Sequence, residues 1–221
     1  MMTAPLAQTR GVQVNVALLV GILLHNLTYP LSNAGGVWPA LFYLFYAAIF
    51  VVATWALTAD IRLRSLVGLT GLLVLVAGLA NSYAPSNFAA LAVFVTSIAY
   101  LGSMCLVLAL YTFGAKTVMG DVVLAATSLY LMIGLTFAAV LALIEWLAPG
   151  SFVANSGAPL TWQQSVYFSY VTLTTLGYGD ITPVGFYAQS FVSFEAVLGV
   201  LYTVILLSRL VGLHASGGKA Q

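Results

Sequence analysis

Charged side chains are scarce in this sequence, with six lysines and arginines and five aspartates and glutamates among 221 residues, or 5%. A soluble globular chain carries roughly 25%. Hydrophobic residues make up 62% of the chain, and its mean hydropathy is +1.07. These values exclude a soluble domain and predict a membrane protein. The net charge of +1 indicates no affinity for nucleic acid.

Cysteine and histidine are nearly absent. Cys105 is the single cysteine, so an intrachain disulfide is excluded, and its place in an apolar run predicts a packing role. The two histidines, His25 and His214, stand alone in the sequence. No Ser/His/Asp, paired-acid or metal-ligand pattern is present, so we expect neither an enzyme nor an organic cofactor.

Long apolar runs dominate what remains. About 20 apolar residues are needed to cross the hydrocarbon core of a bilayer. Six runs meet this need, at Gly11 to Tyr29, Pro39 to Ala59, Leu63 to Ala80, Asn87 to Phe113, Val122 to Leu147 and Phe186 to Leu213.

The few basic residues predict the orientation of these spans, because lysine and arginine next to a span are retained on the cytoplasmic side. All of them fall on one side if the N-terminus is cytoplasmic, namely Arg10, Arg62, Arg64, Lys116, Arg209 and Lys219. We therefore expect both termini in the cytoplasm, and the compact chain suggests the plasma (inner) membrane of a prokaryote.

Between the last two spans, residues 175–180 read TLGYGD. A dehydrated cation can exchange its water shell for a stack of backbone carbonyl oxygens that face one axis. Aiming successive carbonyls the same way requires φ > 0 at alternating residues, which Gly177 and Gly179 tolerate. Thr175 can add a ring of hydroxyl oxygens at the inner mouth.

The wider segment Tyr167 to Pro183, YFSYVTLTTLGYGDITP, resembles the pore loop of the potassium channel family. The resemblance implies that K⁺ binds to carbonyls of a selectivity filter. The filter residues are Thr175, Leu176, Gly177, Tyr178 and Gly179, and carbonyls of the first four bind the ion. Leu176 stands where valine is commonest. The family fold needs four filter strands around an axis, so three identical subunits are the expected partners, with membrane lipid around them.

The predicted fold is therefore an all-α integral membrane protein with six transmembrane helices, a re-entrant pore helix and a filter loop, assembled as a tetrameric channel pore. Leu160 to Thr174 is too short to span and predicts the pore helix, whose C-terminal end favours a cation. Val122 to Leu147 and Phe186 to Leu213 become the outer and inner helices. The stretch Pro149 to Pro159, rich in Ser, Asn, Gly and Pro, predicts an exposed extracellular loop.

Several residues are expected to support the filter. By resemblance, Tyr167 and Phe168 occupy positions where relatives carry tryptophans that ring it, and the Tyr167 hydroxyl can hold Asp180. Thr174 ends the pore helix beside it. Glu145 matches an acid that braces the filter entrance in relatives, although it can equally be an interfacial residue in water.

On the inner helix, Glu195, Gly199 and Thr203 are candidate gating or pore-lining residues. Glu195 lies deep in the membrane, where a carboxyl needs a partner or water. A hydrogen bond to the back of the pore helix is favoured over exposure to the ion cavity. Gly199 falls where many potassium channels have a hinge glycine, and close helix packing is an equal alternative.

The first four spans have the layout of a voltage-sensor domain, but Asn87 to Phe113 contains no lysine or arginine. We therefore predict no voltage gating by that mechanism. The expected domains are a four-helix bundle at residues 1–113, a cytoplasmic linker at 114–121, a pore domain at 122–213 and a short cytoplasmic tail at 214–221. The short linker favours a bundle that lies beside its own pore helices.

Together these features predict a potassium-selective channel that conducts K⁺ passively through a homotetrameric pore. The alternative is a non-conducting membrane scaffold or sensor that retains the channel fold.

Overall fold

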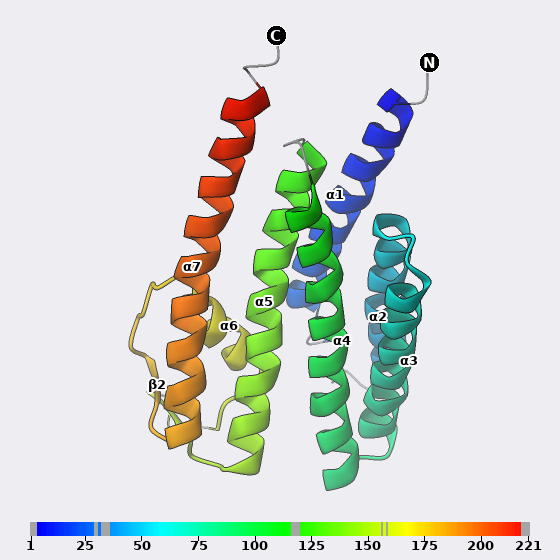
Figure 1. The fold of residues 1–221 in the computed structure, drawn as a ribbon. Coiled ribbons are helices and arrows are strands. Elements are labelled where there is room, and N and C mark those ends of the chain that lie inside the picture. Colours follow the sequence, from blue (N-terminus) through cyan, green and yellow to red (C-terminus); the bar gives the residue numbers. More distant parts are fainter. Residues whose placement is uncertain are drawn as a thin grey trace. The chain divides into compact units, whose positions relative to one another are not determined.

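Helices account for nearly all of the regular structure. The computed structural model describes residues 4–28, 31, 36–115, 120–155, 157 and 159–217. Its helices are α1 (Ala4–Thr28), α2 (Trp38–Leu57), α3 (Ile61–Tyr83), α4 (Asn87–Gly114), α5 (Gly120–Leu147), α6 (Trp162–Leu173) and α7 (Phe186–Gly217) (Figure 1). Two short strands, β1 (Phe152–Ala154) and β2 (Ile181–Pro183), flank α6 in the sequence.

Short polar residues begin several of these helices, as expected where the first N–H groups have no partner within the helix. The side chain of Asp60 accepts from the backbone N–H of Arg62 at 2.8 Å and starts α3. Ser86 does the same for α4 through the N–H of Ala89, at 3.1 Å. The backbone is extended at both of these caps.

Five helical segments of the described chain are long and apolar enough to cross a membrane, so the protein is a multi-pass membrane protein. They are Gly11–Thr28, Ile61–Tyr83, Asn87–Gly114, Gly120–Leu147 and Phe186–Gly212. The remaining predicted span, Pro39 to Ala59, coincides with α2, which is 20 residues long. Among the described residues, α2 contains a shorter apolar helical segment, Trp38–Ala48. The all-α membrane fold is thus confirmed.

The chain divides into two compact units, and the boundary falls inside α5. We call residues 1–132 with 213–221 the bundle unit and residues 133–212 the pore unit. The predicted domain limits at 113, 121 and 213 remain predictions. Residues 116–119 of the expected linker, which include Lys116, lie outside the described part of the chain, as does Lys219.

In the bundle unit, α1 packs on α2, α2 on α3, and α3 on α4 (Figure 1). Tyr100 of α4 is fully buried, and its hydroxyl donates to the carbonyl of Ala47 in α2 at 3.0 Å. His25 of α1 is 4% exposed and stacks on Tyr46 of α2, with ring centroids 4.2 Å apart. Buried aromatic and polar contacts therefore hold these helices together, and His25 is a packed core residue.

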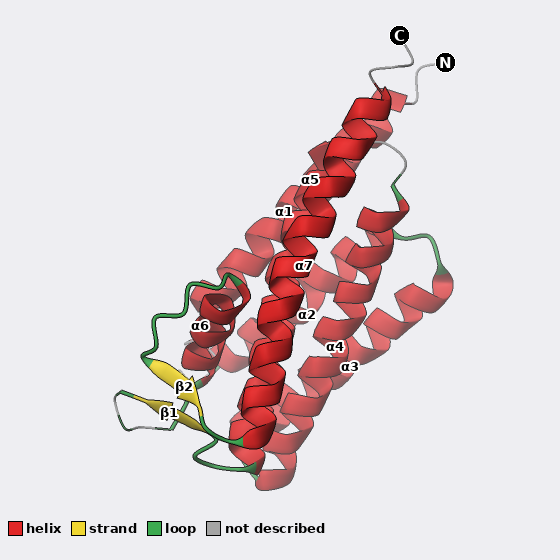
Figure 2. Cartoon of the chain, turned by 60° about the vertical axis from the view of Figure 1, so that its left-hand side comes forward, coloured by secondary structure: helices red, strands yellow, loops and turns green. Residues whose placement is uncertain are grey.

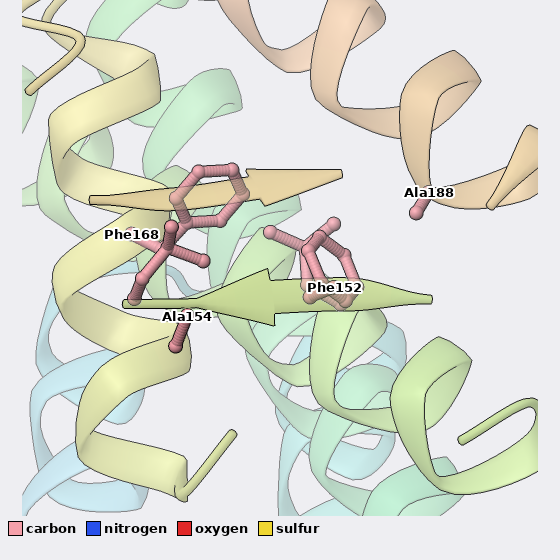
Figure 3. Close-up of a cluster of buried hydrophobic side chains, with 6 residues drawn as sticks. Phe152, Ala154, Phe168 and Ala188 are labelled. Carbon is pink, nitrogen blue, oxygen red and sulfur yellow. The ribbon is translucent and has the colours of Figure 1, made fainter. Parts of the chain in front are cut away.

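In the pore unit, β1 and β2 form an antiparallel pair in which Val153 faces Thr182 (Figure 2). Behind the pair lies a small apolar core, formed by Leu141, Phe152, Ala154, Phe168, Ile181 and Ala188 (Figure 3). Phe152 and Ala154 are buried, so the prediction of an exposed loop over Pro149 to Pro159 was wrong for this part. Alternate residues of β1 point inward because a strand presents successive side chains to opposite faces.

Candidate selectivity filter

The short helix α6 leads into the TLGYGD segment. Its 12 residues span roughly 18 Å, too little to cross a bilayer. A capping box starts it: the Thr161 hydroxyl accepts from the Gln164 N–H at 3.3 Å, and the Gln164 side chain accepts from the Thr161 N–H at 2.8 Å. The helix ends at Leu173, one residue before the predicted end.

Backbone bonds tie the first residues of the segment to the end of α6. The carbonyl of Val171 accepts from the N–H groups of Leu176 at 2.9 Å and Gly177 at 3.3 Å, and that of Thr172 accepts from Thr175 at 2.9 Å. These bonds satisfy carbonyls that a helix end leaves open. The segment thus starts from a defined position on the pore helix.

The segment itself has φ > 0 at every second residue. The angles are +58° at Thr175, +57° at Gly177 and +76° at Gly179. Alternation of left-handed and ordinary backbone turns successive peptide groups so that their N–H groups gather on one side and their carbonyls on the other. The alternation predicted for the two glycines is present. Its extension to Thr175 was missed, since a threonine rarely adopts this conformation and no sequence signal marks it.

Residues 174–179 are exposed in the isolated chain. Leu176 is 56% exposed and Tyr178 is 64% exposed, although both are apolar or aromatic. A cavity of about 300 Å³ lies beside the segment, between it and α7, and Gly177 and Val192 are among its walls. The carbonyl-bearing loop is therefore accessible to an ion, and its large side chains are available for contact with another chain.

Two aromatic residues of α6 were expected around the filter, and they behave differently. The Tyr167 hydroxyl donates to Asp180 at 2.8 Å, which is the bond that the resemblance implied, and its ring stacks on Tyr178 with centroids 6.3 Å apart. This hydrogen bond raises the pKa of Tyr167, so the hydroxyl keeps its proton at neutral pH. Phe168 instead packs edge-on against Phe152 in the apolar core (Figure 3).

Two of the candidate threonines, Thr174 and Thr203, bond to the backbone of their own helices. Thr174 donates from its hydroxyl to the carbonyl of Tyr170 at 2.6 Å. In α7 the Thr203 hydroxyl donates to the carbonyl of Gly199 at 3.0 Å. Both side chains remain exposed in the isolated chain despite these hydrogen bonds.

Glu145 at the end of α5 is 8% exposed, so the alternative of an interfacial residue in water was wrong. Its two carboxylate oxygens accept from the backbone N–H groups of Gly150 at 3.0 Å and Phe152 at 3.1 Å. Phe152 begins β1, and β1 pairs with β2, which follows Asp180 directly. The carboxylate thus braces the strand pair directly. It supports the outer end of the filter segment only indirectly, through that pair.

Glu195 of α7 is fully buried. One of its carboxyl oxygens hydrogen-bonds to the Ser169 hydroxyl on α6, and Ser169 also contacts the carbonyl of Gly134 in α5 at 2.7 Å. The predicted bond to the back of the pore helix is therefore present, and Glu195 does not line an open cavity. Ser169 and Gly134 were missed. Ser165 and Ser169, four residues apart on one face of an apolar helix, were the available signal.

Gly199 lies directly against the end of the pore helix. A Cβ at this position would stand 2.2 Å from the carbonyl oxygen of Leu173. No side chain fits at that distance, so the glycine has a packing reason, which was one of its two predicted roles. The hinge role stays a prediction.

Comparison with known proteins agrees with this geometry for part of the chain. Residues 141–213 match a family model described as "Ion channel". The match starts in α5 and runs through β1, α6, the filter segment and β2 into α7. Residues 141–213 therefore carry an ion channel pore domain. Residues 1–140 lie outside the match.

Relatives of this pore domain bear potassium channel names. Two pore potassium channel c of Oryza sativa subsp. japonica is 39% identical over 82 residues, which are 37% of this chain and 16% of that protein. Inward rectifier potassium channel Kirbac3.1 of Paramagnetospirillum magnetotacticum is 33% identical over 82 residues, 37% of this chain and 26% of its own. Two-pore potassium channel 2 of Arabidopsis thaliana is 34% identical over 97 residues, 44% of this chain and 20% of its own.

The similarity thus covers between 16% and 26% of the length of these relatives. No solved structure matches the chain. The rest of each relative has no counterpart in the comparison.

Proposed function

We propose that this protein is a K⁺-selective channel that conducts passively through a homotetrameric pore. The observation that carries the proposal is the alternation of positive φ at Thr175, Gly177 and Gly179 within TLGYGD. That backbone turns carbonyl oxygens to one side, which is the arrangement that replaces the hydration shell of K⁺.

The carbonyls of Thr175, Leu176, Gly177 and Tyr178 are the proposed ligands, and the ion is the cargo. Neighbouring ions in single file repel one another and move on, so each site binds K⁺ firmly enough for entry and weakly enough for exit. Asp180 lies at the outer end, where its negative charge favours the approach of cations.

Four chains are needed because one chain supplies one filter strand. The exposure of Leu176 and Tyr178 supports this assembly, since large apolar groups beside a polar carbonyl array have no use on a free surface. Part of α7 is exposed in the same way and can pack against other copies or lipid, at Val197, Val200, Leu201 and Val204. A closed fourfold ring with identical interfaces satisfies both needs.

Orientation and location follow from the basic residues. Arg62 and Arg64 begin α3, and Arg209 lies near the end of α7. With these on the cytoplasmic side, both termini are cytoplasmic and the outer end of the filter faces outward, in the plasma (inner) membrane. α4 contains no lysine or arginine, so the channel opens without charge movement in that helix.

Current through planar bilayers that contain the purified protein tests the function. With K⁺ and Na⁺ on opposite sides, we expect a reversal potential close to the K⁺ equilibrium potential. A reversal potential without K⁺ preference would contradict the proposal. An assembled protein that passes no current under any condition would favour the rival function, a non-conducting scaffold.

The variant Gly177→Ala tests whether the filter backbone is responsible for selectivity. Alanine at φ +57° costs about 1–2 kcal/mol of local strain and displaces the carbonyls, so selectivity or current should be lost. Gly36→Ala is the control, because Gly36 has φ +60° and equally open surroundings but lies in the bundle unit. Equal loss of selectivity in both variants would refute a filter role for Gly177.

A further inference from the structure

A polar cavity lies at one end of the bundle unit, away from the filter segment in the sequence. Its volume is about 410 Å³. Five helices supply its walls, with Gly11 and Val14 from α1, Trp55 and Ala56 from α2, Arg64 from α3, Tyr111 from α4 and Asp121 from α5. A cavity of this size accommodates a small polar molecule or a lipid headgroup.

On the acidic side of the cavity, two buried acceptor oxygens have no hydrogen-bond donor among the described residues. Asp121 accepts from the Tyr111 hydroxyl at 2.6 Å through Oδ2, while its buried Oδ1 has no partner among the described residues. Asn15 is fully buried beside it; its amide donates to the carbonyl of Gly11 at 3.1 Å, and its Oδ1 is likewise unpartnered within the described part of the chain. Two buried acceptors without a donor are unfavourable unless a ligand or water supplies one.

Glycine at position 11 keeps this carboxylate close to α1. A Cβ there would lie 3.2 Å from Asp121 Oδ2 and 3.6 Å from the Tyr111 hydroxyl. A side chain at this position would crowd the oxygen of Asp121 that accepts from Tyr111.

The opposite charge lines the same cavity. The Arg64 guanidinium donates to the carbonyls of Thr58 and Trp55, both at 2.7 Å, and its carbon lies 5.6 Å from the centre of the Trp55 ring. These contacts hold the group in place but neutralise none of its charge, and Asp121 accepts no bond from it in the described structure. A fixed guanidinium with N–H groups to spare is suited to a phosphate.

An apolar groove continues from the cavity. Its volume is about 340 Å³, and Val14 and Ala56 line both spaces. Its other walls come from α1 and α2, at Ala17, Leu18, Phe45, Ala48 and Val52. Phe45 is 43% exposed and Val52 is 68% exposed, so the groove opens on the surface of two apolar helices. Tryptophan and arginine at its polar end are typical of the depth at which lipid headgroups lie.

We infer that the bundle unit binds one phospholipid whose headgroup carries both an ammonium group and a phosphate, as phosphatidylethanolamine does. The ammonium N–H groups donate to Asp121 Oδ1, the phosphate faces Arg64, and an acyl chain lies along the groove. A choline headgroup has no N–H to donate, and a glycerol headgroup has no cation to place beside Asp121. The site therefore distinguishes lipids by the headgroup.

Native mass spectrometry of the delipidated full chain tests this inference. The protein is titrated with phosphatidylethanolamine, phosphatidylcholine and phosphatidylglycerol of equal chain length. We expect phosphatidylethanolamine to bind about tenfold more tightly than the other two, as befits one charge-assisted hydrogen bond. Equal binding of the three lipids, or no bound lipid, would overturn the inference and leave water as the donor to Asp121.

Two variants and a matched control sharpen the experiment. Asp121→Asn should abolish the preference for phosphatidylethanolamine over phosphatidylcholine. Arg64→Gln should weaken the binding of all three lipids. Arg62→Gln is the control, since Arg62 is exposed, lies two residues away and does not line the cavity. A preference that survives Asp121→Asn would contradict the assigned contact. If that variant does not fold, the headgroup comparison on the unaltered protein still decides.

Discussion

At the scale of single residues, the filter segment depends on conformations that few residues adopt. Thr175 has φ +58°, which costs a non-glycine residue about 1–2 kcal/mol. The N–H of the same residue bonds to the carbonyl of Thr172, and the next two N–H groups bond to Val171. These bonds at the end of α6 offset the strain, as is common where a functional site requires an unusual backbone.

The hydrogen bond between Tyr167 and Asp180 joins α6 to the outer end of the filter segment. Tyr167→Phe removes the hydroxyl and keeps the ring stacked on Tyr178. We expect the filter to leave its conducting geometry more often, seen in single-channel records as a lower open probability. Tyr187→Phe is the control, because Tyr187 is 76% exposed and its hydroxyl makes no hydrogen bond within the described part of the chain. An unchanged open probability in Tyr167→Phe would show that the bond is dispensable.

The contacts of Ser169 predict the protonation state of Glu195. A hydroxyl has one proton, yet Ser169 lies within bonding distance of both the Gly134 carbonyl and the Glu195 carboxyl. The Gly134 carbonyl and Glu195 Oε1 are both bonded through Ser169 only if Glu195 carries a proton and donates to Ser169, while Glu195 Oε2 is buried without a partner among the described residues. Glu195→Gln, which keeps a donor, should therefore change the free energy of unfolding by less than about 1 kcal/mol.

Glu195→Ala removes the donor and leaves a cavity, so we expect a loss of about 2–4 kcal/mol. Thermal unfolding of both variants in the same detergent measures the difference. A glutamine variant as unstable as the alanine variant would mean that the carboxylate, and not its protonated form, is required.

At the scale of elements, α6 is held between two helices that approach it at glycines. A Cβ on Gly134 of α5 would lie 2.5 Å from the Tyr170 ring, and one on Gly199 of α7 would lie 2.2 Å from the carbonyl oxygen of Leu173. The second contact is with backbone, which cannot rotate away. Close helix approach at small residues is the usual means of packing in membranes.

Gly199→Ala should therefore push α7 from the end of α6 and destabilise the pore unit by about 1–3 kcal/mol. Gly212→Ala serves as the control on the same helix, since a Cβ at Gly212 meets nothing within 4 Å. Alanine favours a helix by about 1 kcal/mol over glycine, so this variant should be neutral or slightly more stable. Thermal unfolding and the fraction of assembled protein measure both effects. Two equally stable variants would argue for the hinge role of Gly199.

At the scale of the whole molecule, the two units have different surfaces and different chemistry. The pore unit contains the filter segment. Only 17% of the apolar segment Phe186–Gly212 of α7 is buried in the isolated chain. The bundle unit contains the polar cavity and an α4 without any charged residue. A voltage sensor moves several charges through the membrane field, each worth about 2.3 kcal/mol per 100 mV.

Because α4 has no such charge, we expect the open probability to change by no more than about twofold between −100 and +100 mV. A voltage sweep at equal K⁺ concentrations on both sides provides the measurement. A steep sigmoidal dependence would mean that charges elsewhere in the chain sense the field, and the prediction from α4 would be wrong.

Sequence alone determined the membrane class and the positions of the long apolar helices, and it predicted the filter segment. Each of these depends on local information: apolar runs of sufficient length, and glycines spaced two residues apart in TLGYGD. The bond between Tyr167 and Asp180 was also predictable, because both residues belong to one continuous segment that resembles a known pore loop.

Only the tertiary structure decided which distant residues meet. β1 is three residues long and became buried by pairing with β2, 27 residues further along the chain from Ala154 to Ile181. The sequence predicted a bracing role for Glu145 and a bond from Glu195 to the pore helix, but only the structure shows which groups they contact: the N–H groups of Gly150 and Phe152 for Glu145, and Ser169 for Glu195. The strand pair and the contact between Glu195 and Ser169 join residues at least 26 positions apart, and a local pattern does not specify which residue is the partner. The polar cavity of the bundle unit arises in the same way, from residues of five helices that no single segment could predict.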